Sequence, residues 1–399
     1  GKYRFKLLDK STGKLVFSRG FCSIFGEWEL TPEASKIYRT FSESLRFPCP
    51  SATVIVVLEK RGESNTFKEI WRTELDPKDN YVQTAKPAEP GALLTLQNSG
   101  DPSHKVDLLI LGDGYTAKER SKFEQDARKM MEALFVQEPF KSRRKDFNVW
   151  GLCPPSSESG VNRPSTGQRR RSPLGCSYDA FGSERYVLTY ENKALRDIAS
   201  FAPYEFVQIL LNDKIYGGGG IFGLYGTTSI DNEFASYIFV HEFGHHFAGL
   251  ADEYYSSGVA YQSSADRPEP WEPNVTANPL QPKWSALLTP NVPLPTPWKK
   301  AEFEALNNAY QTRRKEIRDQ NLPESAMEAH FRKNSADEIT LLGKDKYSGR
   351  VGAFEGAHYE ATGYYRPQID CIMFARNPVP FCATCQKAIN DMITFHISK

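Results

Sequence analysis

The segment HEFGHHFAGLADEY at residues 241–254 restricts the possible fold more than any other part of the chain. Asp231 is suited to cap a helix over residues 232–249. On such a helix His241 and His245 lie four residues apart and project from one face, so both imidazoles can bind one Zn²⁺ ion. Catalytic zinc usually has three protein ligands, so the fold must bring one more side chain to this face.

Glu242 lies between the two histidines of this H-E-x-x-H pattern. Its place next to His241 lets it hydrogen-bond a metal-bound water without binding the metal, which predicts a general base for hydrolysis. The alternative is a chance match on an ordinary amphipathic helix. Gly249 is suited to end the helix, and a residue that can bind metal follows within one turn, so we expect one catalytic zinc ion.

The third ligand is expected just beyond the helix. Gly249 permits a sharp turn with a positive φ, and Asp252, three residues later, can return beneath the metal. We therefore predict Asp252 as the ligand and keep Glu253 as the alternative, whereas the one that does not bind would orient a histidine. His246 is a weaker candidate because it lies five residues from His241 and leaves the i, i+4 face.

The order of apolar segments predicts two domains in these 399 residues. Residues 1–96 contain short alternating and β-branched runs, which indicate a β-sandwich accessory domain. Residues 97–399 begin with alternating strands and helices, which indicate a twisted mixed sheet with crossover helices. We expect this second domain, of the α+β or α/β class, to carry the catalytic site.

Composition excludes some classes of function. The chain has 50 Lys+Arg and 49 Asp+Glu, a formal net charge of +1, so it has no general basic field for nucleic acid. It also lacks an uninterrupted apolar run long enough for a transmembrane helix. The chain begins without an apolar leader, so we expect either a cytosolic protein or one whose signal peptide has been removed.

Seven cysteines are too few for a disulfide-based scaffold, and their odd number predicts at least one thiol that is free or pairs with another molecule. Cys382 and Cys385 form a C-x-x-C motif. A redox role is possible, but two free or locally bridged cysteines at the start of a C-terminal helix are the favoured interpretation, since no thioredoxin-like pattern surrounds them. One C-x-x-C also falls short of a four-ligand zinc site.

Several segments in the same order resemble the bacterial IgA-peptidase family of zinc endopeptidases, a metzincin-like group. They are LLILGDGY at 108–115, YGGGG at 216–220, the segment 241–254, FEGA at 354–357 and DCIM at 370–373. The resemblance covers about 100–399, and the amino-terminal part is similar to the β-sandwich domain that often precedes the catalytic domain there. It implies a secreted or cell-envelope bacterial protein but leaves the substrate open.

Metzincins follow H-E-x-x-H-x-x-G-x-x-H/D, and here the glycine and the aspartate each fall one position later. They also have a methionine beneath the metal, for which Met373 is the candidate, with simple core packing as the alternative. The phenols of Tyr364 and Tyr365 are candidates for stabilising the oxyanion, although packing or surface roles compete. A glycine run before the helix can accept a bound peptide as an added strand, or can be a flexible loop: Gly217, Gly218, Gly219 and Gly220.

Together these features predict a zinc-dependent endopeptidase that acts on protein or peptide substrates. Two alternatives stay open. One is a β-sandwich adhesin with a vestigial metal site, which the intact Glu242 disfavours because a purely structural site needs no base. The other is a zinc hydrolase acting on a non-peptide amide, such as a deacetylase.

Overall fold

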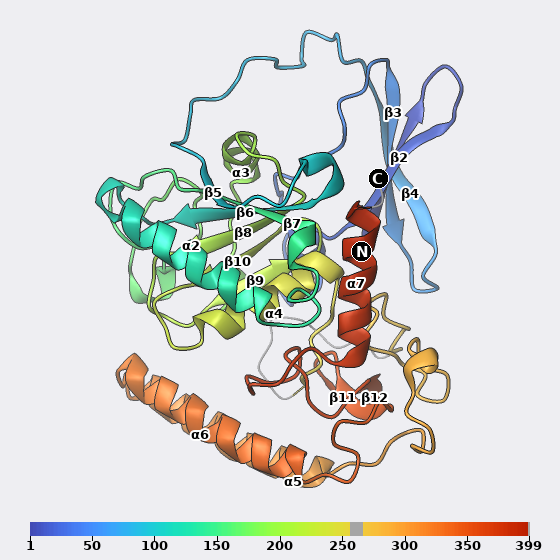
Figure 1. The fold of residues 1–399 in the computed structure, drawn as a ribbon, viewed down its shortest axis with the longest axis vertical. Helices are drawn as coiled ribbons and strands as arrows, with labels where there is room; N and C mark the ends of the chain where they lie inside the picture. The colour runs from blue at the N-terminus through green and yellow to red at the C-terminus, as the bar shows by residue number, and fades with distance from the viewer. Residues whose placement is uncertain (256–265, 398–399) are drawn as a thin grey trace.

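The computed structural model describes residues 1–255 and 266–397. A four-stranded amino-terminal sheet stands beside a larger domain built on a six-stranded sheet (Figure 1). The predicted fold class, a β module followed by a mixed-sheet domain with helices, is confirmed. Among the described helices, none is both long enough and apolar enough to cross a membrane.

The strands are β1 (Tyr3–Asp9), β2 (Leu15–Phe21), β3 (Val54–Arg61), β4 (Phe67–Leu75), β5 (Leu94–Gln97), β6 (Val106–Asp113), β7 (Phe147–Leu152), β8 (Phe206–Leu211), β9 (Gly218–Ile221), β10 (Tyr225–Ser229), β11 (Phe354–Ala357) and β12 (Glu360–Arg366). The α-helices are α1 (Ile24–Trp28), α2 (Arg120–Phe135), α3 (Asn192–Ala199), α4 (Ala235–Ala248), α5 (Lys300–Asp319), α6 (Glu324–Gly343) and α7 (Ala383–Ile397).

The amino-terminal sheet has the order β2-β1-β3-β4 with antiparallel neighbours. Phe5 and Leu7 alternate inward from β1 and pack with Val54 and Val56 of β3. A sandwich would cover this face with a second sheet. In the described residues 1–96 the cover comes instead from a loop, whose Phe47 ring lies 6.0 Å from that of Phe5.

The larger sheet has the order β5-β7-β6-β8-β10-β9. Its four central strands run parallel, and both edge strands are antiparallel to their neighbours. Strand β5 already belongs to this sheet, although it begins at Leu94, before the expected domain boundary at residue 97. Because β6 is buried on both faces, Leu108 and Ile110 point into one core while Leu109 and Leu111 point into the other.

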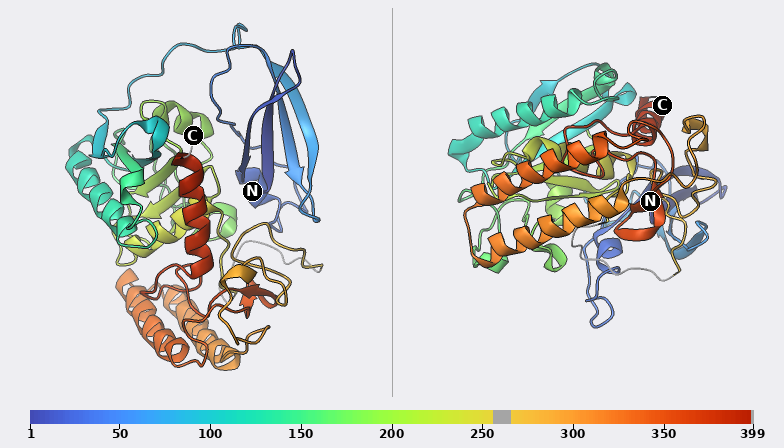
Figure 2. Two further views of the ribbon diagram at one scale, coloured as in Figure 1. Left: turned by 45° about the vertical axis from the view of Figure 1, so that its right-hand side comes forward. Right: turned by 90° about the horizontal axis from the view of Figure 1, so that it is seen from below.

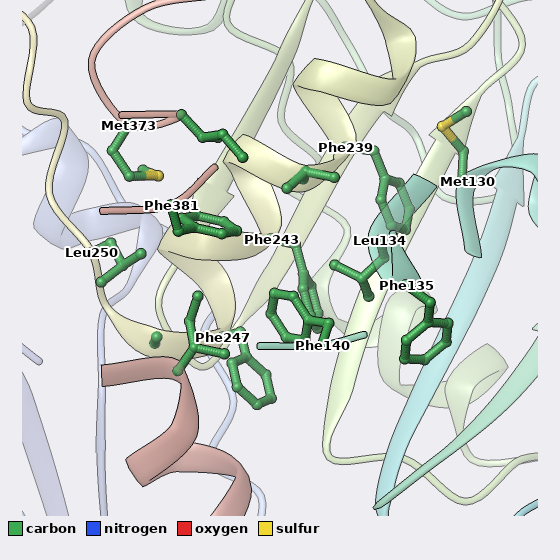
Figure 3. Packing of buried hydrophobic residues seen from close by; sticks show 14 of the residues in the cluster. Met130, Leu134, Phe135, Phe140, Phe239, Phe243, Phe247, Leu250, Met373 and Phe381 are labelled. Carbon is green, nitrogen blue, oxygen red and sulfur yellow. The ribbon is translucent and has the colours of Figure 1, made fainter. Parts of the chain in front are cut away.

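The core between the sheet and helices α2, α4 and α7 fixes the position of α4. Phe243 and Phe247 of that helix pack on Phe140 with ring centroids 5.5 and 5.7 Å apart, and all three are fully buried (Figure 3). Phe381, just before α7, also packs edge-on against Phe140. A residue pattern of i, i+4 phenylalanines therefore anchors one side of α4 in the core and leaves another side for polar chemistry.

The predicted start of α4 is wrong, because the helix begins at Ala235 rather than near residue 232. Asn232 forms a local turn in which its side chain accepts a hydrogen bond from the Phe234 N–H and donates to Ser229. Asp231 forms an ion pair with Lys122 instead of capping the helix. The predicted end is confirmed, since Gly249 takes the left-handed conformation with φ 61°.

Helix α6 packs beside the start of α4, where the ring of Phe331 contacts Phe234. The β11–β12 hairpin lies beside the turn after α4, where Tyr359 N donates to Tyr254 O. Helices α5 and α6 run side by side (Figure 2). A cavity of about 480 Å³ opens between these elements, α4 and strand β9. Residues of the amino-terminal module, among them Lys2 and Leu30, also line it.

Candidate metal centre and catalytic site

Three side chains from α4 and the following turn converge at this cavity. The Nε2 atoms of His241 and His245 lie 3.1 Å apart. Asp252 Oδ1 lies 3.0 Å from the first and 3.3 Å from the second. Gly249 makes this possible, because its left-handed backbone turns the chain back so that a residue three positions later reaches the helix face.

The outer nitrogens of both imidazoles contact backbone carbonyls. Ile372 O accepts a hydrogen bond from His241 Nδ1 at 3.0 Å, and Leu250 O accepts one from His245 Nδ1 at 2.5 Å. A carbonyl only accepts, so each Nδ1 must carry the proton, and in the neutral imidazole each Nε2 then holds a lone pair. The hydrogen bonds thus fix both rings in the orientation that metal-binding histidines need.

This donor set fits a metal cation. Two lone pairs and a carboxylate oxygen at 3.0–3.3 Å repel one another unless a positive charge lies among them. Tetrahedral zinc with bonds of about 2.0–2.1 Å separates its ligand atoms by about 3.3 Å. Without a metal ion, a proton on a histidine must supply the positive charge among these donors. Burial alone would lower the pKa of His245, but the neighbouring Asp252 raises it to about 9.

Glu242 lies on α4 beside these ligands and lines the cavity. Its carboxylate is half-buried and is not part of the three-residue cluster. Burial raises the pKa of Glu242, while the neighbouring histidines oppose that rise. A carboxylate with increased basicity next to a metal centre is suited to accept a proton from water.

Two further candidates for the third ligand lie elsewhere. Glu253 is fully buried and points away from the histidines, with Oε1 3.3 Å from Cys385 Sγ. His246 connects α4 to the sheet, because its Nε2 accepts from Val207 N and its Nδ1 donates to Ile221 O. Neither side chain belongs to the cluster formed by His241, His245 and Asp252.

Phenols that the sequence did not single out surround the candidate ligands. Tyr359 donates its hydroxyl hydrogen to Asp252 Oδ2. The ring of Tyr254 stacks on His241 with centroids 6.4 Å apart, and its hydroxyl accepts from Arg185 at 3.2 Å. Tyr254 lies two positions after Asp252, which is the one sequence signal that could have identified it. Tyr359 lies 107 residues away from Asp252 and gives no such signal.

The two tyrosines predicted for this role are placed differently. Tyr364 lines the cavity, but its hydroxyl donates to Pro268 O at 2.9 Å. Tyr365 is half-buried beside Glu355 and pairs through its backbone with Thr276; it is not among the described residues lining the cavity.

Met373 is fully buried beneath the end of α4. A Cβ added at Gly244 would lie 3.0 Å from its sulfur, so the turn packs closely on the helix. The preceding residue, Ile372, supplies the carbonyl that orients His241. The segment predicted as a methionine turn therefore both packs under the helix and holds one of its histidines.

Glycines 218–220 form most of strand β9 at the edge of the sheet, directly against α4. A Cβ at Gly220 would lie 2.4 Å from the Glu242 carbonyl oxygen, so only glycine permits this approach. Gly218 exchanges backbone hydrogen bonds with Arg185 and Val187 on the outer edge. Gly217 precedes the strand and, unlike the other three, is not among the described residues lining the cavity.

Glu338 of α6 is a second buried carboxyl in the cavity wall. Burial raises its pKa to about 7, although the Asn334 side chain donates to it at 2.8 Å. The Glu338 carboxyl loses its proton near the ordinary glutamate pKa in the unfolded chain, whereas in the folded chain it keeps the proton up to about pH 7. Over that window the folded state binds more protons, so stability falls as pH rises.

We therefore expect Glu338→Gln to stabilise the protein at pH 8 but not at pH 4.5. The shift corresponds to an increase of about 3 kcal/mol in the free energy of unfolding at the higher pH. Urea unfolding at a series of pH values measures it, with Glu328→Gln on the same helix as control. A difference between wild type and variant that does not change with pH would contradict the assignment.

Comparison with known proteins gives two matches that together span most of the chain. The sequence model of the family described as IgA Peptidase M64 matches residues 94–393. The one described as Peptidase M64 N-terminus matches residues 1–72. A comparison with curated individual proteins gives no match.

Proposed function

Because the chain belongs to the IgA peptidase M64 family, and so is a peptidase of a metallopeptidase family, we propose that it is a zinc-dependent endopeptidase. The observation that carries the proposal is that two histidine nitrogens and one aspartate oxygen converge in an open cavity. Glu242 lines the same cavity but is not part of this cluster. Three protein ligands leave a coordination position for the reaction, whereas a structural zinc site normally has four.

His241, His245 and Asp252 would hold the zinc. When bound, zinc acidifies a water molecule and polarises the carbonyl of the scissile bond. Glu242 accepts the proton of the attacking water and later delivers it to the leaving amine. Tyr359 holds the second oxygen of Asp252, which keeps Oδ1 directed at the metal position.

The edge strand β9 is our proposed binding site for the peptide. By strand alternation, the backbone groups of Gly220 face the same outer edge as those of Gly218, which already pair with a neighbouring segment. A substrate backbone added there would lie along the cavity that contains Glu242. We propose the Tyr254 hydroxyl, rather than that of Tyr364, as the donor that stabilises the oxyanion. Tyr254 stacks on His241, whereas the Tyr364 hydroxyl already donates to Pro268 O.

The amino-terminal module contributes to the same cavity, which supports a part in substrate choice. Leu30 and Glu27 line it together with residues of the catalytic domain. The Cys22 N–H donates to Phe222 O at 2.8 Å, directly after strand β9, so the two modules are joined next to the site. A secreted or cell-envelope location is a further proposal, supported by the family resemblance.

The proposal predicts internal cleavage of proteins that depends on a bound metal. Purified protein incubated with casein or immunoglobulins should give fragments with new internal termini, identified by mass spectrometry. The chelator 1,10-phenanthroline should abolish cleavage, the non-chelating 1,7-isomer should not, and added Zn²⁺ should restore it. Removal of terminal residues only, or cleavage that survives chelation in protein of unchanged circular dichroism, would contradict the proposal.

A further inference from the structure

A second group of metal-ligating side chains lies in the core beneath the candidate active site. Glu253, Cys371, Cys382 and Cys385 each offer one ligand atom, and these four atoms lie within 4.8 Å of one another. All four residues are buried, the most exposed being Cys382 at 3%. They come from the turn after α4, the turn before Met373 and the start of α7.

The separations of these atoms fit tetrahedral coordination. Cys371 Sγ lies 4.0 Å from Cys385 Sγ, and Glu253 Oε1 lies 3.3 and 3.6 Å from the sulfurs of Cys385 and Cys382. Zinc with Zn–S bonds of about 2.3 Å and a Zn–O bond of about 2.0 Å separates its ligand atoms by about 3.5–3.8 Å. A disulfide would bring two sulfurs to about 2.05 Å, and the structure records all three cysteines as free.

Backbone N–H groups are directed at the sulfurs, as negatively charged thiolates require. Cys371 Sγ accepts from the N–H of Cys382 at 3.2 Å and of Met373 at 3.4 Å. Cys382 Sγ accepts from the N–H of Cys385 at 3.5 Å. Such hydrogen bonds stabilise thiolates and orient them toward a shared cation.

Glu253 is the residue of the group that points most directly to a bound cation. Its side chain is wholly inaccessible to solvent, and Oε2 has no hydrogen-bond partner among the described residues. Its Oε1 accepts from Asn274 at 2.9 Å and faces the sulfurs. A carboxylate buried in this way is costly unless it is paired or coordinates a metal.

We propose that Glu253, Cys371, Cys382 and Cys385 bind a second, structural Zn²⁺. Three sulfurs and one oxygen in a closed, buried tetrahedron suit zinc, and four protein ligands distinguish the site from the catalytic one. Binding displaces three thiol protons to solvent and leaves the site with a net charge of −2. Buried Arg366, which interacts electrostatically with Glu253 and Cys371, offsets part of that charge.

The position of this site gives it a role in shaping the catalytic centre. Glu253 follows Asp252 directly, and its N–H donates to Met373 O at 2.8 Å. Cys371 is one residue before Ile372, whose carbonyl orients His241. A metal bound here would therefore hold together the backbone segments that position one ligand and orient another.

Metal analysis tests the proposal without relying on activity. Elemental analysis of the wild-type protein should give two zinc ions per chain, and X-ray absorption should show zinc–sulfur scattering. His241→Ala should lose the catalytic zinc and keep one zinc with sulfur ligands. The sulfur-bound zinc is therefore measured independently of the proposed catalytic site. Cys382→Ser should keep one zinc without strong sulfur scattering and unfold at a lower temperature, whereas Cys153→Ser, outside the cluster, should keep both.

Two results would overturn the proposal, and both come from wild type, so they do not depend on the folding of any variant. One is zinc without sulfur scattering in protein that contains all seven cysteines. The other is a disulfide among Cys371, Cys382 and Cys385, detected by alkylation of the denatured protein without reductant followed by mass spectrometry.

Discussion

Glu242→Gln is expected to lower kcat for peptide hydrolysis by about 10²- to 10⁴-fold while the metal content stays unchanged. Glutamine keeps the shape of the side chain but cannot accept the proton of the attacking water. Glu242 is separate from the three atoms that form the candidate metal site, so its loss should not release zinc. The measurement pairs initial cleavage rates with elemental analysis of the same preparation.

Glu272→Gln is the matched control, because Glu272 also lines the cavity but is not part of the metal cluster. Its cleavage rate should stay within a few-fold of wild type. A Glu242→Gln variant with full activity would exclude the general-base role. A variant that loses both zinc and activity would instead make Glu242 part of the metal site.

The parts of the site that could be predicted from sequence are those that depend on local geometry. Two histidines four apart share a helix face, and a glycine after the helix permits the turn toward Asp252. These relations hold within about 12 residues and need no knowledge of the tertiary fold. The start of α4 could not be predicted in the same way, because Asn232 binds Ser229 and Asp231 binds Lys122 from another helix.

The other parts depend on long-range packing. Tyr359 reaches Asp252 only because the β11–β12 hairpin folds over the turn after α4, with Tyr359 N donating to Tyr254 O. The C-x-x-C motif looked incomplete as a zinc site for the same reason. Cys371 and Glu253 complete the group from 11 and 129 residues before Cys382. No spacing rule connects such distant positions.

Asp252→Asn is expected to remove the catalytic zinc and, with it, peptide cleavage. The amide retains the size of the carboxylate but lacks its negative charge, so it attracts a bound cation much less strongly. Loss of an outer-shell partner already costs about 10- to 100-fold in metal affinity, and loss of a charged ligand should cost at least as much. Zinc retained during dialysis against a weak chelator measures this directly.

Glu253→Gln separates the two neighbouring carboxylates. If Asp252 is the catalytic ligand, Asp252→Asn should lose the zinc bound by nitrogen and oxygen and keep the zinc bound by sulfur. Glu253→Gln should weaken the sulfur-bound zinc and retain the other, because its side chain faces Cys382 and Cys385 rather than the histidines. The opposite pattern would assign the catalytic role to Glu253. Equal retention of both ions in the two variants would exclude both assignments, since neither carboxylate would then contribute to metal binding.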